Sequence, residues 1–424
     1  MSPIDGYWAR VRGLQQNARR YLGCTVLFAT TTSLHSLIYN LYLIQIGYDA
    51  GFIGFTSAVL SATRLVFALP AGMVADRIGR KRSMLIGLAG MAVAQFGLSL
   101  LTADWAILGS MAISGVFGAL FMTSVAPFLT EHSSPDQRSL LFTLDSSLTN
   151  LASFFASTAG GYLPLLFGAL LHVDGESAPA YRGVMLVSAC TLALALLPIA
   201  TLTESPRTSS RRRVPWTLRA LRKLPNGKLM VRLVLPRALM AFGAGLVFPF
   251  LNLYFKERFA VSDATLGWIF GITNVVAAAA MLWGGTVAER MGKVRTMLLA
   301  RLLSVPGLLV LGFVPSLAFV AVAHWIRSAL MRLGDPLYMA FAMEQLSEDD
   351  RATGSSLLST GWNVGWSGSP YVSGLLQPRV GWGPLFGGTI VFYVASLALV
   401  YAFFVRGQEV ESLAGERPLE VAGP

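Results

Sequence analysis

The sequence predicts an all-α membrane protein whose twelve transmembrane helices form two homologous six-helix bundles. Three observations support this fold class. Only 13% of the residues are charged, whereas soluble domains carry about 25%. Apolar runs recur along the whole chain, and each is long enough to cross a bilayer as a helix. The two halves also repeat many of the same residues at a constant offset of 213 positions.

The apolar runs define the predicted helices in chain order. A hydrocarbon core of about 30 Å takes about 20 residues to cross as a helix. Backbone groups in lipid must be satisfied within the segment, and no apolar–polar alternation suggests a barrel, so helices are expected. Their approximate spans are 21–46, 51–73, 84–102, 105–127, 139–163, 182–202, 231–255, 264–286, 297–315, 317–342, 353–376 and 384–405. The first run is too long for a signal-peptide core and is expected to remain as a helix.

The runs group into an N-terminal half at 1–202 and a C-terminal half at 231–406. A basic cytoplasmic linker at 203–230 joins them, and a cytoplasmic tail follows at 407–424. Between Pro215 and Leu224, apolar residues are interleaved with basic ones, which predicts a short helix lying on the anionic inner leaflet.

The positive charges predict the orientation of the chain. Most of the 33 Lys and Arg residues fall on the same side as the N-terminus, which indicates that both termini are cytoplasmic in a multi-pass inner-membrane protein. This topology explains the net charge of +11, so no nucleic-acid partner is expected. The expected surroundings are the lipid bilayer, and the expected state is a monomer.

Two polar loops carry the repeat. ADRIGRKR at residues 75–82 is matched by AERMGKVR at 288–295. The shared offset pairs acidic, basic and amide residues in the two halves: Asp76 with Glu289, Arg77 with Arg290, Gly79 with Gly292, Glu131 with Glu344, Arg138 with Arg351, and Asn150 with Asn363. A constant offset across several helices indicates two homologous halves.

These motifs resemble those of the major facilitator superfamily. GMVADRIGRKR is similar to that family's loop signature, and the resemblance extends over the whole chain. Glu-x6-Arg at Glu131 and Glu344, together with TESPR at 203–207, is similar to the sugar-porter type. The seventh predicted helix lacks the paired glutamines of a sugar porter. The fourth has Met111 near the place of a drug antiporter's arginine, and the fifth has no Gly-Pro pair. The substrate class therefore stays open.

The resemblance implies a cytoplasmic gate built from the loop residues. Its expected members are Gly72, Asp76, Arg77, Gly79, Arg80, Glu131, Arg138, Glu289, Arg290, Glu344 and Arg351. Gly72 is expected to let its helix approach a neighbour, and Gly79 to turn at positive φ. Asp76 is expected beside the start of the eleventh helix, where exposed N–H groups favour a carboxylate. The charges then pair across the halves when the gate closes. The alternative is that the arginines only set the topology and the acids are solvated.

Polar residues within the helices predict the substrate cavity, because such residues are expensive in a bilayer. The candidates are His35, Tyr39, Asn40, Arg64, Asn150, Asn252, Tyr254, Arg327, Arg332, Trp362 and Asn363. Asp335 is the expected proton-coupling residue, and Asp145 is the second candidate. The alternative reading is a structural Arg–Asp pair that neutralises itself between helices. Arg332 lies one turn from Asp335 on the same predicted helix.

The predicted function is secondary active transport by alternating access, moving a small organic solute across the inner membrane by proton-coupled efflux. The alternative is a facilitator or proton symporter that imports a sugar or another polar metabolite. No nucleotide loop, metal-ligand cluster or nucleophile motif points to an enzyme, and neither a cofactor nor a metal is expected. Cys24 and Cys190 imply no disulfide.

Overall fold

The computed structural model describes residues 14–203, 227–347 and 350–405. The described residues form helices and their connections. The predicted leaflet helix between Pro215 and Leu224 and the tail at 407–424 lie outside these ranges.

The first half contains six long helical segments in the predicted order. They are α2 (Gln16–Gln45), α3 (Ala50–Ile78), α4 (Arg80–Leu100), α5 (Asp104–Glu131), α6 (Pro135–Gly160) and α8 (Ala178–Leu194), which α9 (Leu196–Ala200) extends. The short helix α7 (Leu163–Leu171) lies in the connection between α6 and α8. The apolar runs therefore located these helices correctly, and the structure lengthens most of them into the polar flanks.

The second half repeats this arrangement. Its helices are α11 (Gly227–Gly245), α12 (Leu251–Phe259), α13 (Asp263–Met291), α14 (Lys293–Phe313), α15 (Leu317–Glu344), α16 (Arg351–Val380) and α17 (Trp382–Val400), ending in the π turn Tyr401–Val405. The span predicted at 231–255 corresponds to one segment that is long and apolar enough to cross a membrane, Gly227–Phe259, but its helix is not continuous. It breaks between α11 and α12 at the 3-10 turn Phe248–Phe250, where Pro249 has no N–H to donate.

Eleven helices among the described residues are long and apolar enough to cross a membrane. α16 is also long enough, at 30 residues, but its sequence is rich in Ser and Gly and contains one Asn and two Trp. It packs between α3 of the first half and α11 of the second, so much of its surface faces protein rather than lipid. This position explains how a twelfth spanning helix can be polar.

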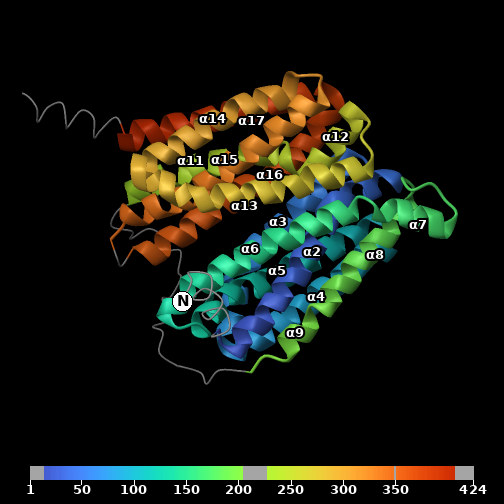
Figure 1. Cartoon of the computed structure of the whole chain (residues 1–424), viewed down its shortest axis with the longest axis horizontal. Helices are drawn as coiled ribbons and strands as arrows, with labels where there is room; N and C mark the ends of the chain where they lie inside the picture. Colours follow the sequence, from blue (N-terminus) through green and yellow to red (C-terminus); the bar gives the residue numbers. More distant parts are fainter. Residues whose placement is uncertain (1–13, 204–226, 348–349, 406–424) are drawn as a thin grey trace, which may run out of the picture.

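Figure 1 shows each half as one helical bundle, blue to green below and yellow to red above. The bundles meet toward the right of the view, near α7 and α12, and spread apart toward the left. We call the left end, where α3 turns into α4 and α13 into α14, the motif end. The opposite end, where α2 turns into α3, is the far end.

Candidate functional site: a cleft between the two halves

Two helix pairs join the halves at the far end: α3 with α16, and α6 with α13. A Cβ on Gly54 of α3 collides with the carbonyl oxygen of Pro370 in α16, and a Cβ on Gly374 collides with that of Ala50. Between the other two helices, a Cβ on Gly267 lies 2.6 Å from the carbonyl oxygen of Ser157. The far end is therefore closed by backbone-to-backbone packing that only glycine permits.

Toward the motif end, α6 and α13 separate and enclose a cleft of about 590 Å³. Its lining is mixed, with hydroxyl and amide groups from α6 and apolar side chains mainly from α13: Ser139, Phe142, Thr143, Ser146, Ser147, Asn150, Leu151, Val275, Ala278 and Met281. Asn150, a predicted cavity residue, lies on this wall and donates to the carbonyl oxygen of Ser146 at 2.8 Å. The volume is large enough for a small organic molecule.

Asn40 and Asn252 join the halves instead of lining an open cavity. Asn40 donates to Oδ1 of Asn252 at 2.9 Å and to the carbonyl oxygen of Pro249 at 2.7 Å. Asn252 donates to the carbonyl oxygen of Leu37 at 2.9 Å. Both side chains are buried. Their repeated Asn-Leu-Tyr sequence thus makes a near-symmetric clasp between α2 and α12.

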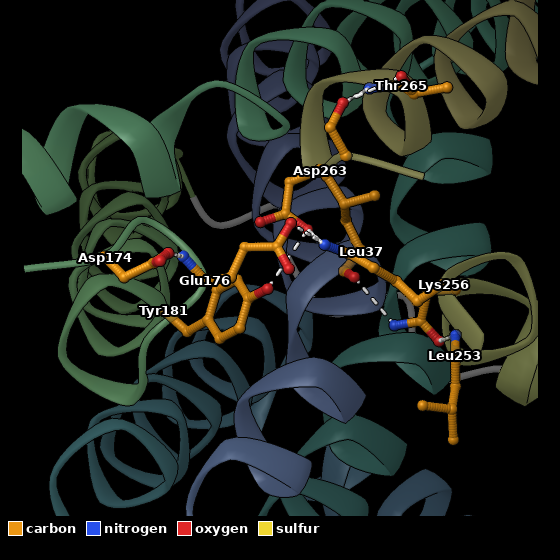
Figure 2. A network of polar contacts seen from close by, with 10 residues as sticks. Leu37, Asp174, Glu176, Tyr181, Leu253, Lys256, Asp263 and Thr265 are labelled. Carbon is orange, nitrogen blue, oxygen red and sulfur yellow. Dashed lines mark hydrogen bonds and ion pairs between the residues drawn. The ribbon is translucent and has the colours of Figure 1, made fainter. Parts of the chain in front are cut away.

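An ionic network at the far end also crosses between the halves. Figure 2 shows Lys256, Asp263, Glu176 and Tyr181 converging on one point. Lys256 Nζ lies 2.8 Å from Asp263 and also pairs with Glu176 of the first half, and Tyr181 donates to Asp263 at 3.3 Å. The sequence reasoning missed this network because its members come from three separate loops or helix ends. The sequence gives one indication of this network, the isolated Lys256 at the end of an apolar run.

The motif-end charges pair within each half. Arg80 Nη2 lies 2.7 Å from Asp76, and Arg80 Nε lies 3.7 Å from Glu131. In the second half Lys293, at the position matching Arg80, pairs with Glu344, which matches Glu131. The expected contact of Asp76 with the start of α16 is absent among the described residues, and its side chain is 68% exposed. The open motif end holds the two halves too far apart for that contact.

Arg138 and Arg351 each donate a hydrogen bond to the end of the helix that precedes them, α5 and α15. Arg138 donates to the carbonyl oxygen of Thr130 at 3.3 Å, and Arg351 donates to that of Met343 at 3.2 Å. Each arginine thus satisfies a carbonyl at the end of the helix that carries the gate glutamate. Glu289 and Arg290 are exposed at the end of α13.

Gly79 confirms the predicted turn at positive φ, and Gly292 makes the same turn in the second half. Gly79 has φ 96° and Gly292 has φ 82°, a region that favours glycine. Gly72 makes no close helix contact in this structure, since a Cβ placed there meets nothing within 4 Å, and its role in helix approach stays a prediction for the state closed at the motif end. Arg77 lies in the last turn of α3.

Polar groups of the first half lie around α2. His35 stacks on Tyr39 with ring centroids 4.6 Å apart, and its Nδ1 lies 3.2 Å from Gln95 of α4. Asp145 of α6 accepts a hydrogen bond of 2.6 Å from the Thr25 hydroxyl. Arg64 is exposed on α3 beside α5. Of these residues, Arg64 is the most exposed.

Asp335 forms a structural pair with an arginine between two helices, as the alternative reading expected, but the arginine is Arg301 and not Arg332. Asp335 lies 3.2 Å from Nη2 of Arg301 on α14, while Arg332, one turn away on α15, is exposed. Two guanidinium groups lie over the ring of Tyr338: Arg301 at 4.7 Å and Arg237 of α11 at 5.9 Å. Arg237 also lies 5.2 Å from the ring of Trp362 on α16. We call Arg237, Arg301, Asp335, Tyr338 and Trp362 the arginine cluster.

Other predicted cavity residues lie inside the second bundle. Tyr254 is fully buried and donates to the carbonyl oxygen of Leu311. Arg327 is 6% exposed, packs 3.5 Å from the centre of the Phe248 ring and donates to the Tyr393 hydroxyl at 3.0 Å. These two residues hold helices of one half together. Asn363 is half-buried on α16, next to Trp362.

Comparisons with known proteins agree with this architecture. Residues 21–236 and 233–422 match the sequence profile described as Major Facilitator Superfamily. An uncharacterized MFS-type transporter of Bacillus subtilis, YceJ, is 24% identical over 92% of this chain and 97% of its own length. The multidrug resistance protein MdtG of Salmonella choleraesuis is 24% identical over 73% of this chain and 75% of its own.

Two further comparisons extend this picture. The efflux pump azaK of Aspergillus niger is 33% identical over 30% of this chain, so the chain spans only 27% of that pump in the match. Among solved structures, a bacterial homolog of the human lysosomal transporter Spinster, in an inward-facing and occupied conformation, superposes with a TM-score of 0.73. It covers 91% of this chain and 95% of that one at 16% identity, which shows a shared fold.

Proposed function

Because the chain belongs to the Major Facilitator Superfamily, we propose that it is a secondary active transporter that exports a small organic solute across the inner membrane in exchange for protons. The observation that carries the proposal is the asymmetry between its ends. The halves pack backbone to backbone at the far end and enclose a cleft toward the motif end. This geometry is one of the two access states that alternating access requires.

The second state requires the far end to open. The pairs that must then separate are Lys256 with Glu176, Tyr181 with Asp263, and Asn40 with Asn252. The pairs of Arg80 with Glu131 and of Lys293 with Glu344 lie within single halves, so they can survive the movement. With the positive charges facing the cytoplasm, the motif end is the cytoplasmic one and the structure is inward-open.

Closing of the motif end brings Asp76 to the start of α16 in this proposal. Asp76 is exposed and ends a helix on the first half, while α16 begins at Arg351 on the second. The start of α16 presents backbone N–H groups that stabilise a nearby carboxylate by about 0.3–1 kcal/mol. Glu289, which matches Asp76, is placed to meet the start of α6 by the same symmetry.

Proton coupling is assigned to Asp145 ahead of Asp335, which reverses the order expected from the sequence. Asp335 neutralises buried Arg301, so protonating it leaves a buried cation without its partner. Asp145 is bound by the neutral hydroxyl of Thr25 and pairs with no cation among the described residues. It can therefore gain or lose a proton without stranding another charge.

Reconstitution into proteoliposomes tests this function. A panel of a lipophilic cation, an aromatic carboxylate, a nucleoside and a hexose is offered with and without an imposed pH gradient. Export in exchange for protons predicts that the gradient drives at least one solute above its equilibrium distribution, and that a protonophore abolishes the accumulation. Equilibration of a sugar or nucleoside without any response to the gradient contradicts antiport and supports the facilitator.

A further inference from the structure

We propose that the arginine cluster binds the anionic group of the transported solute, and that the substrates are small organic carboxylates with a flat apolar part. This inference rests on the proposed function, because it names the substrate class of the same transporter. The cluster draws on four helices of the second half: α11, α14, α15 and α16.

The charges of the cluster do not balance. Arg237 and Arg301 carry two positive charges, and Asp335 is the one acid that the described structure places against them. Arg301 is 1% exposed, so its charge is removed from water. Uncompensated buried cations are strongly unfavourable, and an anion supplied by a ligand removes the deficit.

The guanidinium groups also hold unused donors. The Nε and Nη1 atoms of both Arg237 and Arg301 are buried and have no hydrogen-bond partner within the described part of the chain. Buried donors of this kind are rare in native proteins. An arginine presents its donors as a planar fork that matches a carboxylate, so this deficit points to a carboxylate-like ligand.

The fold itself does not require these charges, as the internal repeat shows. At the 213-residue offset, Arg301 and Asp335 correspond to Leu88 and Met122 of the first half. In the first helix of each half the Asn-Leu-Tyr repeat sets an offset of 212, so Arg237 corresponds to Thr25. The homologous half therefore builds the same bundle with neutral side chains, and the arginine cluster serves a role specific to the second half.

The exposed part of the arginine cluster, the side chain of Asp335, faces the space between the halves. On α15, Val322 and Ile326 are exposed beside an apolar groove with Phe319, which marks the lipid side of the helix. Asp335 follows Ile326 by nine residues, which at about 100° per residue places it half a turn away. The 38% exposure of its side chain is thus toward the interior.

The depth and the neighbours of the cluster suit an amphipathic anion. Arg237, Arg301, Asp335 and Trp362 lie eight to eleven residues from the motif ends of their helices, or about 12 to 17 Å. Trp362 stacks on Trp366 with centroids 6.0 Å apart and an interplanar angle of 17°, beside Arg237. A flat apolar group can pack on these indoles while its carboxylate reaches the guanidinium groups.

Binding of three probes that share one ring system tests the charge requirement. The full chain in detergent is titrated with 2-naphthoate, 2-naphthylmethylamine and 2-naphthylmethanol, and melting is followed by the fluorescence of its nine tryptophans. We expect naphthoate to raise the melting temperature in a saturable way and the amine to have no effect at equal concentration. Equal stabilisation by all three probes, or stabilisation by the amine alone, overturns the proposal.

Variants then locate the site. Arg237→Gln should weaken naphthoate binding at least tenfold, whereas Arg232→Gln, which removes an arginine from the same helix but outside the cluster, should leave it within twofold. Asp335→Asn removes the competing carboxylate and should strengthen naphthoate binding several-fold. This opposite effect keeps the test decisive if Arg237→Gln fails to fold. Unchanged affinity in Arg237→Gln, or weakened affinity in Asp335→Asn, overturns the assignment.

The binding measurements separate this inference from the proposed function. Naphthoate binding that needs Arg237, without any uphill transport in proteoliposomes, contradicts the proposed function and leaves the anion site standing. Uphill transport of the amine by a chain that does not bind naphthoate overturns the anion site and leaves the proposed function standing.

Discussion

Nε of Arg80 lies 3.7 Å from Oε1 of Glu131, and the matching residues Lys293 and Glu344 form the same ion pair in the second half. Each pair links the turn between two helices to the end of a third helix of the same bundle. Because the same ion pair recurs in both halves, the motif-end residues of each half are held together within their own bundle. We therefore predict that the exposed acids Asp76 and Glu289 change partners during transport, whereas Glu131 and Glu344 keep theirs.

Asp76→Asn should leave folding nearly intact and impair transport. The Asp76 side chain is 68% exposed, and exposed ion pairs contribute about 0–1 kcal/mol, so the melting temperature should change by only a few degrees. Loss of its contact with the start of α16 destabilises the state closed at the motif end. In a Cys190→Ser background, a cysteine at Ser146 in the cleft should therefore react faster with a maleimide. Unchanged labelling and transport make ADRIGRKR a topology signal only.

Lys256→Met should shift the protein away from the state seen here. Asp263 is 4% exposed and loses its cation, and removal of one partner of a buried pair costs about 3–5 kcal/mol. A destabilised far end opens, so labelling at Ser146 should slow at least tenfold. Lys228→Met, which removes an exposed lysine from α11, is the matched control and should not change the rate. A uniform loss of stability with no change in labelling argues against a conformational role.

Gly54→Ala should block closure of the far end. Its Cβ collides with the carbonyl oxygen of Pro370, and backbone atoms on both sides cannot move away cheaply. We expect at least a tenfold loss of transport, together with slower labelling in the cleft. Gly368→Ala on α16 meets nothing within 4 Å and serves as the control that keeps its activity. Full activity in Gly54→Ala means that the two helices need not touch.

Asp145→Asn should uncouple transport from protons. The variant is expected to lose accumulation driven by a pH gradient while it still exchanges substrate down its own gradient, because the cleft and the arginine cluster are untouched. Asp335→Asn should retain the response to the gradient. If Asp335→Asn alone abolishes the response, the coupling role belongs to Asp335, as the sequence first suggested.

Hydropathy predicted the helices because the length and apolarity of a helix depend on local sequence. The repeat identified the matching motif-end residues but not the ion pairs that they form within each half. The partner of Asp335 could not be predicted in this way. Arg332 is its neighbour one turn away on α15, but the facing helix α14 supplies Arg301, and only packing decides between them. Asn40 and Asn252 show a similar limit, since a polar residue on an inner helix face suits a cavity or a clasp equally well.

The ionic network at the far end shows why sites formed by residues from separate loops are difficult to predict from sequence. Lys256 and Glu176 are separated by 80 residues, and they meet only because α12 and the connection after α7 lie at the same end of two different bundles. No periodicity links them, and neither residue has a counterpart in the other half at the repeat offset. Their pairing follows from how the two halves dock.

The movement of the halves is tested most directly by two distances between spin labels, one across each end of the molecule, measured in two doubly labelled variants under the same conditions. Spin labels at Ser139 and Met281 report the motif end across the cleft, and labels at Val173 and Pro315 report the far end, all in the Cys190→Ser background. Alternating access predicts that substrate and acid shorten the first distance and lengthen the second, each by several ångströms. Two distances that stay fixed, or that change in the same direction, contradict it.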